Sequence, residues 1–191
     1  MKEDIHTISP KNQQEWRQWL IENHASEQAV WLLAYKKSAN KATITWSETV
    51  DEALCFGWID GMRKSINDES FVQFLCKRKP KSGWSKINKE KIERLIKDGL
   101  MTEAGLKSIE IAKQNGSWTL LDEIEELTVP EDLKAAFAVN TGSEYFFLSF
   151  SKSVKKMILQ WIAFAKKPET RQKRINEVAE LAAKNQKPKH I

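Results

Sequence analysis

Residues 58–78 read WIDGMRKSINDESFVQFLCKR, and this stretch decides the fold of the first half of the chain. Its two ends, 58–66 and 70–78, are rich in aromatic and aliphatic residues, and the polar segment 67–69 separates them. Such a pattern predicts a β-hairpin with its turn at Asn67-Asp68-Glu69. Both alternating sets of side chains in 70–78 are mostly apolar, so we expect this strand to be covered on both faces.

Further elements precede the hairpin. A helix is expected to begin near Ser9, and residues 29–37 are apolar and aromatic, which is typical of a buried strand. Residues 43–46 are either the hairpin partner of that strand or the lead-in to a helix that Ser47 caps. This order of helices and hairpins favours an α+β fold in which helices pack on an antiparallel sheet.

Beyond Pro80 the pattern changes to helices. Apolar residues recur at spacings of three and four in several segments, and turn or capping residues separate them. We therefore predict an α+β domain over residues 1–80 and an all-helical region over 81–185 that packs on it. The tail 186–191 is predicted to be disordered.

The composition is that of a globular protein, with 41% hydrophobic and 30% charged residues among 191. No apolar run approaches the roughly 20 residues of a membrane span, and the N-terminus does not resemble a signal peptide. We expect a cytoplasmic protein with no membrane insertion. Cys55 and Cys76 lie in apolar runs and are expected to be buried, reduced thiols. Neither a metal site nor a cofactor is indicated, because the three histidines are scattered.

The net charge of +5 hides three blocks of alternating sign. Residues 77–97 carry nine basic and two acidic groups, 98–151 carry three and ten, and 152–191 carry eleven and three. Two interpretations remain open: the basic blocks are neutralised by the acidic one within the molecule, or they bind a polyanion.

Four motifs carry a family resemblance: ALCFGWIDG at 53–61, PKSGWSKIN at 80–88, GLMTEAGL at 99–106 and WIAFAKKPETRQKRI at 161–175. In this order they resemble the YdeI/OmpD-associated family of bacterial proteins, also labelled bacteriocin-protection. The resemblance implies a YjbR/CyaY-like first half and a link to stress or bacteriocin tolerance, with no reaction or cofactor. One common family form has Thr-Pro-Arg before the Ser-x-Trp-Ser motif, whereas residues 75–80 here read LCKRKP.

The segment 77–89, KRKPKSGWSKINK, is the main candidate site. Its serine hydroxyls, the amides near Gly83 and the start of the next helix form a possible phosphate cradle. The cations would add charge, and Trp84 would offer a stacking face to a base. In the alternative interpretation a serine caps the helix, Trp84 fills the junction between sheet and helix, and the lysines are solvated.

Asp60 and the basic run 166–174 also have two interpretations each, and Cys55 is considered as a nucleophile. Asp60 either pairs with a nearby cation, such as Arg78, or acts as a general base. Cys55 is a poor nucleophile candidate, because apolar surroundings raise the pKa of a thiol. The basic run 166–174 either contacts phosphate or pairs with the acidic residues of 122–132.

Three functional hypotheses follow, and none assigns a catalytic residue. The first is a non-enzymatic protein that binds nucleic acid, another polyanion or a protein partner through 77–89. The second is an enzyme or small-molecule-binding protein with a pocket between 58–60 and 82–88. The third is a protein-binding apolar stripe on the last two helices. The candidate ligand-binding residues are Trp58, Asp60, Arg78, Lys79, Lys81, Ser82, Trp84, Ser85 and Asn88.

Overall fold

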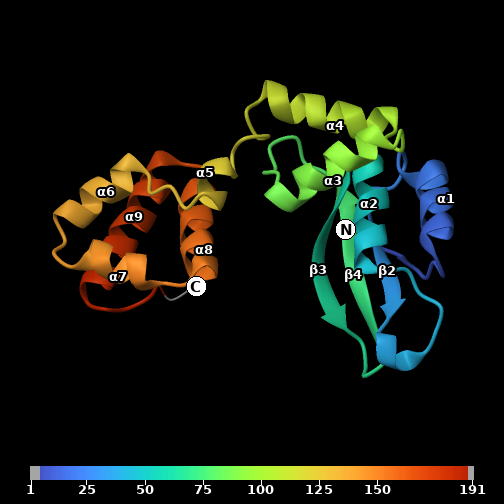
Figure 1. The fold of residues 1–191 in the computed structure, drawn as a ribbon, viewed down its shortest axis with the longest axis horizontal. Coiled ribbons are helices and arrows are strands. Elements are labelled where there is room, and N and C mark those ends of the chain that lie inside the picture. The colour runs from blue at the N-terminus through green and yellow to red at the C-terminus, as the bar shows by residue number, and fades with distance from the viewer. Residues whose placement is uncertain (1–4, 189–191) are drawn as a thin grey trace. The chain divides into compact units, whose positions relative to one another are not determined.

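The computed structural model describes residues 5–188, and the chain divides into two compact units, Met1–Trp118 and Thr119–Ile191 (Figure 1). The first unit combines a four-stranded sheet with helices, and the described part of the second contains helices only. The predicted α+β class, with a sheet in the N-terminal half and helices in the C-terminal half, is confirmed.

The sheet has the strand order β1-β2-β4-β3. Its strands are β1 (Thr7–Ile8), β2 (Ala29–Tyr35), β3 (Trp58–Ser65) and β4 (Ser70–Lys77). The predicted hairpin is formed by β3 and β4, and β4 also pairs antiparallel with β2. The short β1 pairs parallel with β2, so the sheet is mixed rather than purely antiparallel.

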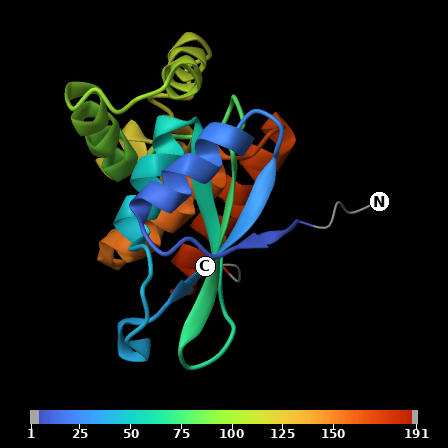
Figure 2. The same ribbon diagram turned by 90° about the vertical axis from the view of Figure 1, so that its right-hand side faces the viewer.

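Two helices cover one face of this sheet (Figure 2): α1 (Gln13–Asn23) and α2 (Trp46–Cys55). Of the two interpretations of residues 43–46, the lead-in to a helix is correct, but the predicted cap Ser47 is wrong: Thr45 caps α2 and forms a capping box with Glu48, and Ser47 lies inside the helix. A short 3-10 helix, η1 (Lys37–Ala39), lies between β2 and α2.

The expectation that β4 is covered on both faces is wrong. Gln73 and Leu75 are buried, whereas Val72 and Phe74 on the other face remain partly exposed. The side chains of β2 alternate in the same way between buried and partly exposed. The reason is that the buried cluster containing α1 and α2 takes its sheet residues from one face only.

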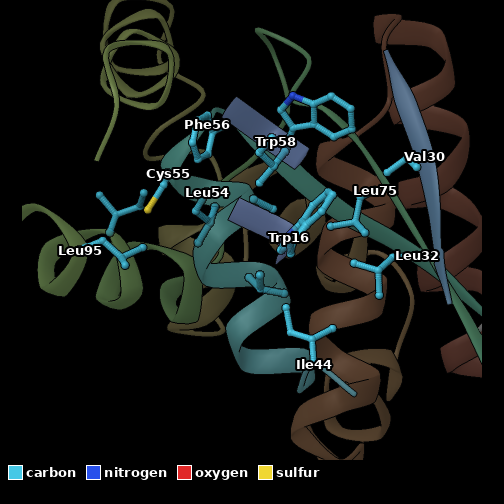
Figure 3. Close-up of a cluster of buried hydrophobic side chains, with 14 of the residues drawn as sticks. Trp16, Val30, Leu32, Ile44, Leu54, Cys55, Phe56, Trp58, Leu75 and Leu95 are labelled. Carbon is cyan, nitrogen blue, oxygen red and sulfur yellow. The ribbon is translucent and has the colours of Figure 1, made fainter. Parts of the chain in front are cut away.

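The core of the first unit lies between this face and the helices (Figure 3). Trp16 and Trp58 are fully buried there, together with aliphatic side chains of β2, α2 and β4. Trp84 is 1% exposed and belongs to the same cluster. Three tryptophans of the first unit are thus core residues, whereas Trp31 is partly exposed on β2 and Trp46 is 48% exposed.

Two more helices belong to the first unit: α3 (Lys86–Lys97) and α4 (Glu103–Gln114). Ile92 and Ile109, one on each helix, are buried in the core of the sheet domain. The compact unit therefore extends beyond residue 80. Helix α4 approaches the end of α2 so closely that a Cβ on Gly105 would overlap the carbonyl oxygen of Cys55.

Buried ion pairs join α2 to its neighbouring helices. Asp51 accepts hydrogen bonds from Lys91 Nζ at 2.6 Å and from Arg94 Nη2 at 2.5 Å, both on α3. Glu52 accepts one from Arg17 Nη1 of α1 at 2.6 Å. Both carboxylates are almost fully buried, so their charges require these partners.

The second unit consists of α5 (Asp122–Glu125), α6 (Glu131–Ala138), α7 (Ser143–Ser149), α8 (Lys152–Ala163) and α9 (Pro168–Ala183). Its separate core includes Leu133, Phe147, Ile158, Ile162 and Ile175. Residues 186–188 follow α9 without regular secondary structure, and the rest of the predicted disordered tail, 189–191, lies outside the described residues.

Within residues 5–188 no helix combines the length and the apolar character that crossing a bilayer requires. In the same range no three histidine, cysteine or acidic side chains gather as ligands for a metal ion.

We predict that Asp51→Asn lowers the free energy of unfolding by about 3 kcal/mol, because it leaves the largely buried Lys91 ammonium without its carboxylate. Urea denaturation followed by circular dichroism measures this change. Lys41→Ala is the control, since it removes the exposed ion pair with Glu69 and should have a much smaller effect. Equal losses in the two variants would contradict the assignment of Asp51 as a structural anchor.

Candidate functional site

The segment 77–89, here called the basic loop, runs from the end of β4 into the first turn of α3. Its middle is fixed to the end of α4, because the carbonyl oxygen of Pro80 accepts hydrogen bonds from Asn115 Nδ2 at 2.8 Å and Ser117 Oγ at 3.0 Å. The loop therefore has a defined conformation set by residues far away in the sequence.

Arg78 organises the loop from inside. Its backbone amide donates to the carbonyl oxygen of Gly57 at 2.9 Å, next to the start of β3. Its guanidinium carbon lies 3.5 Å from the centroid of the Trp84 ring. Its Nη1 donates to Ser82 Oγ at 3.1 Å and to the Gly83 carbonyl oxygen at 3.0 Å. Arg78 thus connects the edge of the sheet, where its backbone bonds to Gly57, to the far end of the turn 78–84, which its side chain contacts.

This cation is desolvated but stays charged. Burial lowers the pKa of Arg78 to about 10, while the nearby carboxylate of Asp60 and thiol of Cys76 act in the opposite direction. Its Nε is buried without a hydrogen-bond partner, and no carboxylate among residues 5–188 forms an ion pair with it. The contacts with Trp84, Ser82 and Gly83 therefore offset part of the desolvation cost of this cation.

Trp84 has the structural role that the sequence left open. Its ring is buried below Arg78, and its centroid lies 5.0 Å from that of Trp118. A base cannot stack on Trp84 in this conformation. The neighbouring ring of Trp118 is only partly buried, with Lys89 Nζ 5.2 Å and Lys113 Nζ 5.4 Å from its centroid.

Sequence reasoning did not find Trp118 and Lys113. The local signal was weak: Trp118 follows the turn Asn115-Gly116 beyond α4, in a stretch without periodicity. Only the tertiary contact with Trp84 places it beside the basic loop. Both residues are therefore added to the candidate site.

The polar residues of the loop form hydrogen bonds within it. Ser82 Oγ donates to the carbonyl oxygen of Lys79 at 2.8 Å, and Ser85 Oγ accepts from the amide of Asn88 at 3.3 Å. Ser85 is thus the N-cap of α3, as one of the two interpretations predicts. These two hydroxyls and the Asn88 amide are already engaged in shaping the turn.

Trp58 and Asp60 are brought close to the loop through Arg78. Trp58 is fully buried, with no partner for its Nε1, and Asp60 accepts a hydrogen bond from Trp46 Nε1 at 3.1 Å. Because Trp58 and Trp84 both lie in the core, their rings do not line an open pocket. The geometry gives no support to the hypothesis of a small-molecule site between 58–60 and 82–88.

The remaining lysines of the site point outward. Lys79, Lys81 and Lys86 are exposed, and none of them forms an ion pair with a carboxylate of residues 5–188. These cations are therefore available to an external anion.

Some basic groups of the second unit, by contrast, form ion pairs. Arg171 donates to both carboxylate oxygens of Asp132, at 2.6 and 3.0 Å, and Lys156 pairs with Glu125. The hydrogen bond from Arg171 lowers the pKa of Asp132. The interpretation of run 166–174 as a partner of the acidic residues is confirmed for Arg171.

The third hypothesis concerns apolar surface on the last two helices. Met157 of α8 and Phe164, which follows it, are 46% and 47% exposed and lie seven residues apart on one helical face. These two apolar side chains are accessible, but Gln160 lies between them on the same face, so the apolar surface is not continuous.

Two family models match the chain. Residues 8–108 match a domain of unknown function (DUF8412), and residues 126–185 match the family described as "Bacteriocin-protection, YdeI or OmpD-Associated". The YjbR/CyaY-like resemblance of the first half is not confirmed. Neither a curated protein nor a solved structure matches the chain.

We predict that Arg78→Lys lowers the free energy of unfolding by roughly 1–2 kcal/mol, because an ammonium cannot both stack on Trp84 and bond to Ser82 and Gly83. Hydrogen exchange of the amides in 78–85 should become faster. Arg63→Lys is the control, since Arg63 also lies over an aromatic ring, that of Phe71, but is exposed. Unchanged exchange in the Arg78 variant would contradict its role in fixing the loop.

Cys55 should be chemically inert in the native protein. Burial, followed by the charge of Glu52, raises the pKa of its thiol to about 11. The thiolate fraction at pH 8 is then about one in a thousand. We expect iodoacetamide to alkylate Cys55 at this pH only in denaturant, as mass spectrometry will show. The pKa of the Cys55 thiol is higher in the folded protein than in the unfolded chain, so the folded state holds this proton more tightly. The contribution of Cys55 to stability is therefore complete at pH values below the unfolded pKa of about 9, and it is lost as the pH rises from about 9 to 11.

Proposed function

We propose that this chain, which belongs to the DUF8412 family through residues 8–108 and matches the family described as bacteriocin-protection, YdeI or OmpD-associated over residues 126–185, is a bacterial polyanion-binding protein. The ligand is nucleic acid, and the binding surface is the basic loop. The protein acts in the cytoplasm without catalysing a reaction, and its binding contributes to stress or bacteriocin tolerance.

The observation that carries this proposal is that three exposed lysines of the basic loop form no ion pair within the described residues. Lys79, Lys81 and Lys86 have no carboxylate partner among residues 5–188, although carboxylates elsewhere in the chain are paired. A group of unpaired cations raises the local positive potential and attracts a polyanion over distances comparable to the Debye length.

The fixed conformation of the loop supports the same function. Arg78, Pro80 and Trp84 are held by contacts inside the first unit, so the outward lysines project from an ordered turn. Ligand binding then costs less conformational entropy than ordering a mobile loop would.

Nucleic acid fits this surface better than a smaller anion. Lys113 extends the basic area beyond the loop, and Trp118 supplies a partly exposed ring beside the cations. Cations contact phosphates in succession along a strand, and an aromatic ring accepts a base of any sequence. We therefore expect binding with little sequence preference.

The test is fluorescence anisotropy of labelled DNA and RNA at two salt concentrations. Each lysine that contacts a phosphate contributes about one unit to the slope of log affinity against log salt. The double variant Lys79→Glu/Lys81→Glu should therefore bind more weakly and reduce that slope by about two. Its thermal unfolding should stay near that of the unmodified protein, because both side chains are exposed.

A second double variant with the same change in net charge distinguishes the effect of the loop lysines from the effect of net charge. Lys166→Glu/Lys167→Glu makes the same change of net charge at exposed positions of the second unit, and it should bind nearly as well as the unmodified protein. Affinity that does not depend on salt, or an equal loss in both double variants, would rule out the basic loop as the binding surface.

A further inference from the structure

The sheet of the first unit has a face that its helices leave uncovered. Trp31 and Leu33 of β2 lie directly opposite Phe74 and Val72 of β4, and directly opposite residues in antiparallel strands point to the same face. All four side chains remain partly exposed. Together with Cys76 and Lys64 they form what we call the open sheet face.

Two aromatic rings lie side by side at the centre of this face. The ring centroids of Trp31 and Phe74 are 5.1 Å apart, with an interplanar angle of 61°. On β3 the irregular segment between Asp60 and Arg63 lies opposite Phe74, and a Cβ on Gly61 would come within 3.1 Å of Phe74 Cδ1. Gly61 therefore leaves room for that ring.

The charge on the open sheet face is positive. Lys64 extends over Trp31, with its Nζ 4.8 Å from the ring centroid. Asp60 is the one carboxylate within β2, β3 and β4, and it lies opposite Leu75 on the helix-covered face, bonded to Trp46 of α2. The open sheet face thus combines two aromatic rings with the Lys64 ammonium, and the strands β2, β3 and β4 place no carboxylate on this face.

The open sheet face continues into the basic loop. Strand β4 carries Phe74 and Cys76 on this face and then leads into the loop. Lys79 lies close enough to act on the Cys76 thiol: burial raises the pKa of this group, and Lys79 and Arg78 oppose that effect. Lys79, an exposed cation of the basic loop, therefore lies next to the open sheet face.

We propose that the open sheet face binds single-stranded nucleic acid, with bases stacked on Trp31 and Phe74 and phosphates contacted by Lys64 and the basic loop. This inference rests on the proposed function and names its ligand as a single strand. Aromatic side chains on an open sheet stack unpaired bases, whereas the bases of a duplex are already stacked. A second copy of the chain is a poor occupant, because it would bring like charges together.

The experiment compares a labelled single strand of about 12 nucleotides with a duplex of the same length. Phe74→Leu removes a ring and keeps an apolar side chain, while Lys64→Glu changes an exposed residue that does not contribute to the core. Each should weaken single-strand binding about tenfold and leave duplex binding nearly unchanged. Photocrosslinking followed by mass spectrometry should place the strand on the peptides that contain Trp31 and Phe74.

Arg63→Glu is the matched control for Lys64→Glu. It reverses the charge of the adjacent residue on β3, whose guanidinium lies over Phe71 rather than over Trp31. The inference is overturned if this control weakens single-strand binding as much as Lys64→Glu does, or if crosslinks do not include the open sheet face.

The same assay separates this inference from the proposed function. Loss of both ligands in Lys79→Glu/Lys81→Glu, with no effect of Phe74→Leu, supports the loop and overturns the role of the sheet. Single-strand binding that depends on Phe74 and Lys64 but not on the loop lysines supports the sheet and overturns the role of the loop. Absence of binding to either ligand at low salt overturns both.

Discussion

The contact between Arg78 and Trp84 is the interaction on which the rest of the site depends. Arg78 ends the hairpin, and Trp84 stands just before α3, so their stacking fixes how the chain passes from sheet to helix. The same guanidinium holds Ser82 and Gly83, which determines the path of the turn between them. Since the group stays charged despite its burial, a positive charge is built into the base of the loop. The exposed lysines extend this charge to the surface.

Local patterns predicted the hairpin of β3 and β4, and they offered a serine cap for α3 and a buried Trp84 as one of two interpretations of the loop. Each of these depends on residues that are close in sequence. The hairpin follows from the alternation of side chains and a turn, and the cap follows from a hydroxyl three residues before an amide. The pairing of β2 with β4 and the contact of Trp118 with Trp84 join segments more than thirty residues apart. Nothing in either segment specifies its partner, because that choice is made by the packing of the whole core.

The charge blocks show the same limit: the sequence gives the charges but does not show which of them contact one another in the folded protein. Opposite net charges along the chain leave open which groups meet, since an ion pair forms only between side chains that the fold brings within a few ångströms. In the second unit the fold brings Arg171 to Asp132, and that pair is internal. In the first unit Asp51 and Glu52 take cations from α3 and α1, whereas Lys79 and Lys81 receive no carboxylate from residues 5–188. The basic loop therefore keeps exposed cations without an ion pair, which net charge alone does not reveal.

The two faces of the sheet separate stability from binding. The face below α1 and α2 buries Trp58, Leu75 and their neighbours, and removing such contacts costs the fold several kcal/mol. The open sheet face keeps Trp31 and Phe74 partly in water, where burial contributes less to stability. Two partly exposed aromatic rings beside cations form a surface feature that the stability of the sheet does not require. Their placement on a rigid sheet, next to an ordered basic loop, is instead what stacking and phosphate contact require of a site for single strands.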